Sequence, residues 1–288
     1  MSDNPQPVPD DFFALPDHRV LMLGGRDAIA FAQAQFMNDL ATLAPGHWQW
    51  SGWLTPKGRL IALFALIVFD AESVQLVLPD ADPAELATQL RRYVFRSRVD
   101  ITVRDDLFVG GAFARQDAAG NAIQRLSPGE IALDVGGDAS PRTLRIGSTQ
   151  ARSDPAAVAL WKAVDLTHGL PRLPPSQSAQ WTPQQLSLDR LRAYSVKKGC
   201  YPGQEIVART HFLGQSKRGL ALFDADTMIP DDADVSDGGQ VLGKVVSIVP
   251  HGAGVRLLAV LPPSRGVTTL SADGSALREQ PFSDGLAR

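Results

Sequence analysis

The stretch Lys197-Lys198-Gly199-Cys200-Tyr201-Pro202-Gly203-Gln204-Glu205 contains the only cysteine of the 288-residue chain. Glycine and proline surround this cysteine, which indicates a tight turn rather than a helix or a strand. Two lysines precede it, and nearby positive charge favours the thiolate, which is the reactive form of cysteine. A lone cysteine can also be a small buried hydrophobic residue. The pattern alone therefore leaves both a reactive and a structural thiol open.

Lys198 to Glu205 resembles the K-G-C-Y-x-G-Q-E signature of the YgfZ family. These proteins are folate-binding relatives of the glycine cleavage T-protein, implicated in iron–sulfur cluster assembly and repair. Upstream elements also resemble the family, with Met37 where threonine is usual and Thr55 where aspartate is usual. The resemblance covers roughly residues 12 to 220, because it includes the segments Gln35–Asp39, Leu54–Arg59, Leu90–Val94, Leu188–Leu191, Ile206–His211 and Gln215–Arg218.

The resemblance implies an α+β, T-protein-like folate-binding fold. Mixed or antiparallel sheets and helices would surround a central cavity, and a C-terminal antiparallel β-barrel would follow. It implies tetrahydrofolate or a derivative as the cofactor, with iron–sulfur enzymes or cluster-assembly proteins as partners. Cys200 and Lys198 are the expected catalytic residues. The candidate folate-binding residues are Arg59, Arg91, Tyr201, Gln204, Glu205 and Arg209.

Composition narrows the class of protein. The formal net charge is −3 and 44% of the residues are hydrophobic. This charge argues against general nucleic-acid binding, and the apolar content is sufficient for a packed core. No segment approaches the roughly 18 apolar residues that a membrane helix needs. A single cysteine fits a reducing cytoplasm, and the scattered histidines give no zinc-like spacing, so no metal site is expected.

Capping patterns predict four helices. Asp27–Leu40 has apolar residues at helical spacing, and Asp-Pro pairs at Asp82 and Asp154 mark two further helix starts. Thr182-Pro183 predicts another helix that runs to Val196. Short strand-like segments separated by turns after Lys217 indicate a barrel or sandwich. We expect a mobile tail over 1–11, a folate-binding α+β region over 12–216 and a barrel over 217–288.

Two groups of basic residues could bind an anion such as the glutamate tail of a folate. A solvated charged surface is the simpler interpretation of either group. Aromatic residues could form the walls of a pterin slot, although most such residues are core. The basic groups are Arg91, Arg92, Arg96 and Arg98, and Lys197, Lys198, Arg209, Lys217 and Arg218; the aromatic residues are Trp48, Trp50, Trp53, Trp161, Phe108 and Tyr201.

The strand after Lys57-Gly58-Arg59 aligns, by resemblance, with the T-protein strand that carries a catalytic aspartate. Here Ala62 or Leu63 occupies that position, and no carboxylate precedes Asp70. An alkyl side chain cannot accept a proton. This favours a folate-dependent accessory factor for iron–sulfur enzymes over an aminomethyl or other one-carbon transferase. A client-binding scaffold without catalysis is the third alternative, so enzymatic activity stays open.

Overall fold

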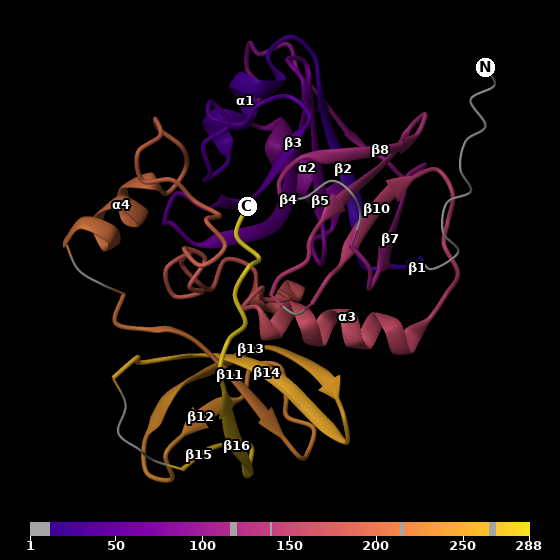
Figure 1. Cartoon of the computed structure of the whole chain (residues 1–288). Helices are drawn as coiled ribbons and strands as arrows, with labels where there is room; N and C mark the ends of the chain where they lie inside the picture. Colours follow the sequence, from indigo (N-terminus) through magenta and orange to yellow (C-terminus); the bar gives the residue numbers. More distant parts are fainter. Residues whose placement is uncertain (1–11, 116–119, 139, 214–215, 265–268) are drawn as a thin grey trace.

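The computed structural model describes residues 12–115, 120–138, 140–213, 216–264 and 269–288. Two five-stranded sheets stand above a closed barrel, and helix α3 lies between the sheets and the barrel (Figure 1). The expected α+β fold with a C-terminal barrel is confirmed. The strand pairings within the sheets are antiparallel, so of the two expected arrangements the antiparallel one is found. The predicted tail over 1–11 lies outside the described residues.

The first sheet separates two hydrophobic layers. Side chains of β4 alternate: Phe64 and Leu66 pack under the helices, whereas Leu63 and Ala65 face the second sheet. This alternation follows from the two-residue period of a strand. The sheet has the order β3-β4-β5-β2-β6, and its elements are β2 (Arg19–Gly24), α1 (Ala28–Gln35), β3 (His47–Leu54), β4 (Leu60–Asp70), β5 (Ser73–Leu78), α2 (Pro83–Arg91) and β6 (Asp100–Val103).

The second sheet completes the inner layer and leads into α3. Helix α3 contacts β1 on one side and the barrel strands β13 and β14 on the other. It therefore joins the sheets to the barrel. The sheet has the order β1-β7-β10-β9-β8, and its elements are β1 (Phe13–Ala14), β7 (Phe108–Ala112), β8 (Ile123–Ser127), β9 (Glu130–Asp134) and β10 (Thr143–Gly147), followed by α3 (Pro155–Thr167) and the 3-10 helix η1 (Pro175–Gln177).

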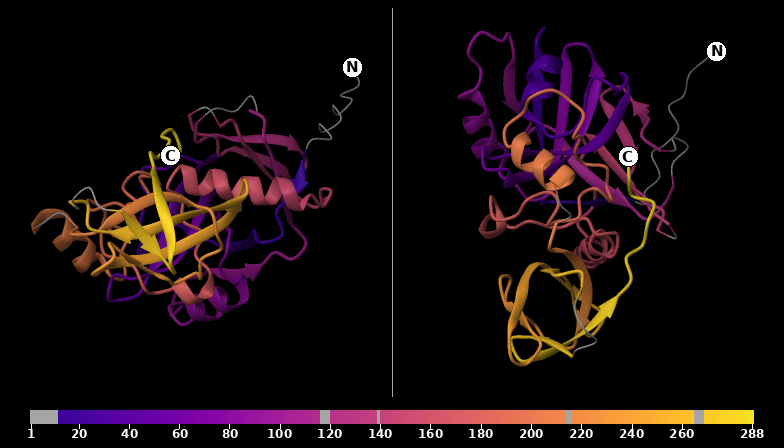
Figure 2. Two further views of the ribbon diagram at one scale, coloured as in Figure 1. Left: turned by 90° about the horizontal axis from the view of Figure 1, so that it is seen from below. Right: turned by 90° about the vertical axis from the view of Figure 1, so that its left-hand side faces the viewer.

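The barrel closes because β11 pairs with both β14 and β16 (Figure 2, right). Its strands end at Gln280, and the last residues leave the barrel and return to the two sheets (Figure 1). Closure removes the exposed edges on which sheets aggregate. The strands are β11 (Gly219–Ala225), β12 (Asp234–Ser236), β13 (Val241–His251), β14 (Gly254–Leu261), β15 (Leu270–Ala272) and β16 (Ser275–Gln280).

The two predicted Asp-Pro helix starts are confirmed. The Asp82 carboxylate accepts from the Ala84 N–H at the start of α2, and Asp154 accepts from the Ala157 N–H at the start of α3. Each carboxylate satisfies a backbone donor that has no partner within the helix. Gly169, at φ +71°, follows the end of α3, where a left-handed residue was expected to stop the helix.

The predicted helix over Thr182–Val196 is wrong. The expected capping hydrogen bond forms, since Gln185 Oε1 accepts from the Thr182 N–H. Ser187 (φ +48°) and Arg192 (φ +54°) then adopt left-handed backbone, which interrupts the helix and gives a series of turns. Helix α4 (Gln204–Leu213) begins only after the cysteine turn. Helix α1 also ends early, at Gln35, because Phe36 is extended and bridges to Trp53.

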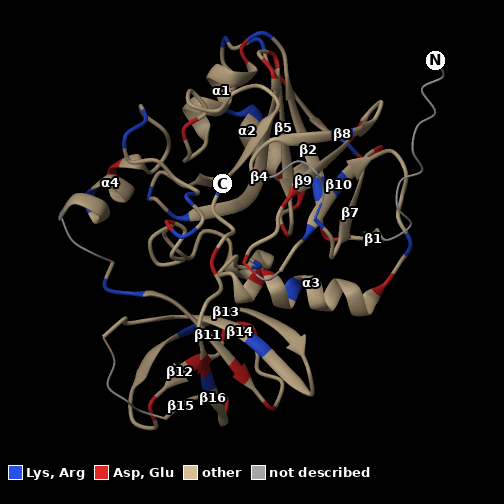
Figure 3. Cartoon of the chain, viewed as in Figure 1, with Lys and Arg blue, Asp and Glu red and all other residues tan. Residues whose placement is uncertain are grey.

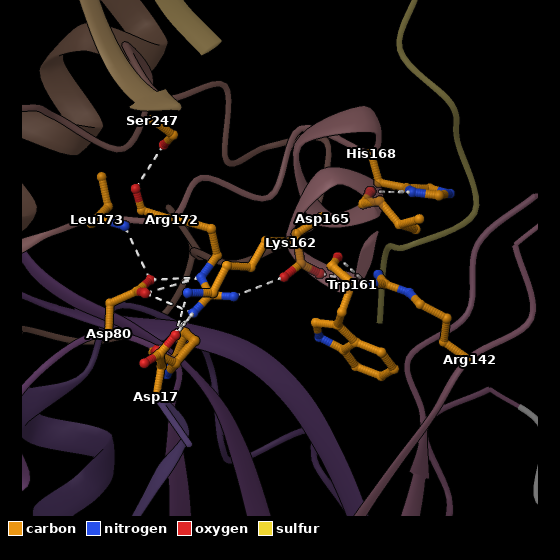
Figure 4. Close-up of polar contacts among 12 residues, drawn as sticks. Asp17, Asp80, Arg142, Trp161, Lys162, Asp165, His168, Arg172, Leu173 and Ser247 are labelled. Carbon is orange, nitrogen blue, oxygen red and sulfur yellow. Dashed lines mark hydrogen bonds and ion pairs between the residues drawn. The ribbon is translucent and has the colours of Figure 1, made fainter. Parts of the chain in front are cut away.

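A buried ion-pair network holds these parts together (Figure 4). Arg172 donates to Asp80 at 2.7 Å and to Asp165 of α3 at 3.3 Å. Asp165 also accepts from Arg142, at 2.6 Å. The Arg172 carbonyl accepts from Ser247 Oγ of β13, at 2.7 Å. One arginine therefore connects the first sheet, α3 and the barrel.

Arg172→Met should lower the free energy of unfolding by about 3–5 kcal/mol, because Asp80 loses its arginine partner and Asp165 keeps only one of its two. Urea denaturation at neutral pH measures this change. Arg278→Met is the matched control. Its ion pair with Asp226 is exposed, so the loss should be at most about 1 kcal/mol. Equal losses in the two variants would contradict the role assigned to the network.

Candidate functional site

The cysteine turn is held from below by Lys198, whose residue surface is only 5% exposed. Its ammonium donates to the carbonyl oxygens of Gln33 (2.5 Å), Phe36 (2.5 Å) and Asn38 (3.1 Å). All three ammonium protons thus have acceptors where α1 ends. Burial, opposed by the nearby Asp39 carboxylate, lowers the pKa of Lys198 to about 8. Lys198 therefore ties the turn to the main chain after α1.

The neighbouring residues explain why the turn has this shape. Ser195 Oγ accepts from the Lys198 N–H, and the Tyr201 hydroxyl donates to the Ser195 carbonyl. Gly203 has φ +80°, and a Cβ there would lie 2.6 Å from the Thr55 carbonyl oxygen. Only glycine satisfies both conditions. The turn therefore packs closely against the loop that contains Thr55.

Cys200 is exposed at the top of this turn. The Lys198 ammonium is directed into the main chain, and within the described residues no hydrogen bond or ion pair joins it to Cys200. Lys198 therefore supports the turn, and an effect of its charge on the thiol stays a prediction. Lys197, which is exposed beside the turn, is the remaining cationic neighbour in sequence.

The expected folate-binding residues do not form one cluster. Tyr201 is buried, with the Lys198 ammonium 4.9 Å from its ring centroid; burial, followed by the charge of Tyr194, raises the pKa of Tyr201. Gln204 donates to the Lys198 carbonyl. Glu205 and Arg209 are exposed on α4. Arg59 lies in the loop that packs against Gly203 and donates to the Gln180 carbonyl and to Gln185. Arg91 lies apart and donates to the Ile101 carbonyl on the helix-covered side of the first sheet.

A second candidate site is the cavity between the two sheets. Two of its polar atoms are buried without a hydrogen-bond partner, namely His18 Nδ1 and Arg142 Nε. Burial, followed by the charges of Arg172, Lys162 and Arg142, lowers the pKa of His18 well below 6.5. The imidazole is therefore neutral at pH 7. The lining consists of His18, Trp50, Ala65, Val77, Pro79, Val135, Arg142, Leu144, Trp161, Asp165 and Leu170.

The space in this cavity is small. The volume open to the centre of a water molecule is about 20 Å³, which is enough for about one water. Sequence reasoning named Trp50 and Trp161 as possible walls but missed His18, Arg142 and Asp165. These residues belong to no recognisable motif, because three segments distant in sequence bring them together.

The C-terminal residues contact the lining of this cavity. The Trp50 indole N–H donates to the Leu286 carbonyl at 2.9 Å, and Leu286 is only 2% exposed. The Arg288 guanidinium lies 5.6 Å from the centre of the Trp48 ring and donates to the carbonyls of Asp134 and Gly136. We call residues 281–288 the C-terminal strap. It connects β3 to the residues after β9, directly beside the cavity lining.

The residue types at the cavity suit a flat pterin ring, because two tryptophans supply apolar walls and two lining residues, His18 and Arg142, have unpaired polar atoms. The volume of the cavity does not suit a folate, because a folate is far larger than the water-sized space present. A folate could therefore enter only if the cavity opened.

The buried length of β4 carries no acid. Leu60 to Phe69 is apolar throughout, and Asp70 is exposed at the end of the strand. Ala62 packs under the helices and Leu63 faces the cavity side. Among the described residues, no group of three or more His, Cys, Asp or Glu side chains could hold a metal ion. No helix within those residues is long and apolar enough to cross a membrane.

Comparison with known proteins identifies relatives. The tRNA-modifying protein YgfZ of Aliivibrio fischeri is 28% identical over 270 residues, which cover 86% of this chain and 84% of the relative. The protein of the same name from Vibrio vulnificus is 29% identical over 233 residues, with 75% and 70% covered. The resemblance to the YgfZ family is confirmed. A search of protein-family models finds no match.

The fold also matches a solved structure. The glycine cleavage system aminomethyltransferase T of Bartonella henselae superposes with a TM-score of 0.73 over 94% of this chain and 84% of that protein. Sequence identity is 13%, so this similarity concerns the fold alone. The expected T-protein-like architecture is thus confirmed.

Lys198→Met should lower the free energy of unfolding by about 2–3 kcal/mol, because the carbonyls of Gln33, Phe36 and Asn38 lose their donor in a largely buried position. Cys200→Ser should change it by less than about 0.5 kcal/mol, because the thiol is exposed. Urea denaturation of the two variants beside the unaltered protein gives both values. A Lys198→Met protein as stable as Cys200→Ser would show that the ammonium does not support the turn.

Proposed function

We propose that this protein is a folate-binding, YgfZ-like accessory factor that supports the assembly or repair of iron–sulfur enzymes. The observation that carries the proposal is the combination of similarity to YgfZ proteins over most of the chain with a T-protein-like fold around a cavity lined by Trp50 and Trp161. The single cysteine fits action in a reducing cytoplasm.

Tetrahydrofolate or a derivative is the proposed ligand. It binds between the two sheets when the C-terminal strap moves away from Trp48 and Trp50. The strap contacts the lining through Trp50 and lies outside the helices and strands, so we propose it as the segment that moves. His18, Arg142 and Asp165 then face the polar edge of the pterin. The glutamate tail extends toward solvent.

Cys200 is the proposed point of contact with clients. Its exposure on a turn anchored by Lys198 lets the thiol reach a partner protein while the backbone stays fixed. Lys198 contributes by positioning. The relatives are named tRNA-modifying proteins, so an iron–sulfur enzyme that modifies tRNA is the client class we propose.

A folate-dependent one-carbon transferase is the second candidate, because the fold matches an aminomethyltransferase. The buried part of β4, without a carboxylate, weighs against it, since Ala62 and Leu63 cannot stabilise charge or accept a proton. A scaffold without catalysis is the third candidate. It differs from our proposal in needing neither folate nor the Cys200 thiol.

Tetrahydrofolate should bind the purified protein, and Arg288→Ala should bind it several-fold more tightly. The substitution removes hydrogen bonds to Asp134 and Gly136 that hold the strap closed, and each such bond is worth about 1 kcal/mol, or roughly a factor of five in affinity. Isothermal calorimetry with Arg278→Ala as the control measures this. Absence of binding in all three proteins would refute the folate proposal. Equal affinities would refute only the movement of the strap.

Cys200→Ser should bind tetrahydrofolate like the unaltered protein but fail to restore iron–sulfur enzyme activity in a bacterial strain that lacks its own counterpart. The reason is that serine keeps the turn but removes the thiol. Immunoblotting must show equal amounts of both proteins. Full restoration by Cys200→Ser would favour the scaffold.

A further inference from the structure

The arginine-rich segment Arg91–Arg98, with the sequence RRYVFRSR, has no part in the cavity just described. Helix α2 packs on the face of the first sheet that contains Phe64 and Leu66, whereas the cavity lies on the face that contains Ala65 and Val77. The sheet therefore separates these arginines from the proposed folate site. Our folate proposal therefore does not use Arg91, which leaves the segment without an assigned role.

The segment is fixed at both ends. Arg91 donates to the Ile101 carbonyl at 2.6 Å. The Arg98 N–H donates to the Asp27 carboxylate at 2.7 Å, and the Arg98 carbonyl accepts from the Asp27 N–H. Between these ends, the Tyr93 ring packs edge-on against Trp53, with centroids 5.9 Å apart. The residues between Tyr93 and Arg98 are thus presented in a defined position.

Phe95 stands out in this segment because it is 85% exposed. Large apolar side chains this exposed often mark interaction sites when polar residues surround them. An open groove adjoins the segment; its lining consists of Arg91, Val94, Val99, Asp100, Ile101 and Thr102. An aromatic ring with a free face next to a groove offers a surface on which another flat ring can stack.

Positive charge surrounds this ring. Arg91, Arg92, Arg96 and Arg98 are all exposed, and Figure 3 shows basic ribbon beside α2. Two acidic residues lie nearby, Asp27 and Asp100. The Asp27 carboxylate accepts from the Arg98 N–H and pairs with Arg26, and Asp100 lines the groove. Four guanidinium groups within eight residues match a polymer with closely spaced negative charges.

We propose that Arg91–Arg98 is a single-stranded RNA-binding site, in which an unpaired base stacks on Phe95 and the arginines contact the flanking phosphates. Aromatic faces combined with basic side chains are the usual means of binding unpaired nucleotides. An acidic peptide would use the arginines but would leave Phe95 without a flat partner, so RNA fits the segment better. Because the chain carries an overall charge of −3, we do not expect the rest of its surface to bind RNA.

Fluorescence anisotropy with a labelled RNA hairpin that has an unpaired loop tests this site at low salt. Phe95→Ala should weaken binding on the order of 10-fold through loss of stacking. Arg96→Ala should weaken it and reduce the steepness of the salt dependence. Both side chains are exposed, so neither variant should affect folding.

Matched controls lie elsewhere on the surface. Phe212→Ala removes an aromatic ring that is 69% exposed on α4, and Arg125→Ala removes an exposed arginine on β8. Both should bind the hairpin like the unaltered protein. The proposal is overturned if the unaltered protein does not bind the hairpin. It is also overturned if Phe95→Ala and Arg96→Ala bind it normally, or if polyglutamate competes as well as RNA does.

Discussion

The two carboxylates and two guanidinium groups of Asp80, Asp165, Arg142 and Arg172 are the constraint on which the rest of the structure depends. Burying charge is costly unless each charge is paired, so these four groups can be buried only when the first sheet, α3 and β10 are all in place. The hydrogen bond from Ser247 of β13 to the Arg172 carbonyl joins the barrel to this network. Two of these residues, Arg142 and Asp165, also line the cavity. Stability of the assembly and the chemistry of its central space thus share these two side chains.

The cysteine motif divides into a supporting and an exposed part. Lys198 satisfies three carbonyls where α1 ends, and Gly203 permits close contact with the loop at Thr55. Cys200 needs neither of these contacts and is left in solvent. The two residues therefore differ in their physical role: Lys198 supports the fold of the turn, and Cys200 is accessible to solvent.

Short-range sequence signals correctly predicted the structural features that neighbouring residues determine. The Asp-Pro caps of α2 and α3 and the short strand segments between turns after Lys217 are examples, because each is marked by neighbouring residues. The helix over Thr182–Val196 failed because left-handed residues at Ser187 and Arg192 are imposed by tertiary packing, which overrides a correct capping signal. The cavity residues His18 and Arg142 carried no signal, since only the fold brings them together. The contacts of the Lys198 ammonium with the main chain after α1 also carried no signal, since proximity to Cys200 in sequence does not reveal where an ammonium points.

We assign the ligand site of this protein to the space between the two sheets, beside the C-terminal strap. A crystal structure of the complex with tetrahydrofolate is the decisive experiment. We expect a pterin ring between Trp50 and Trp161, beside Arg142, with Leu286 moved away and its hydrogen bond from the Trp50 indole broken. A tetrahydrofolate bound elsewhere, with the Trp50–Leu286 hydrogen bond intact, would contradict it.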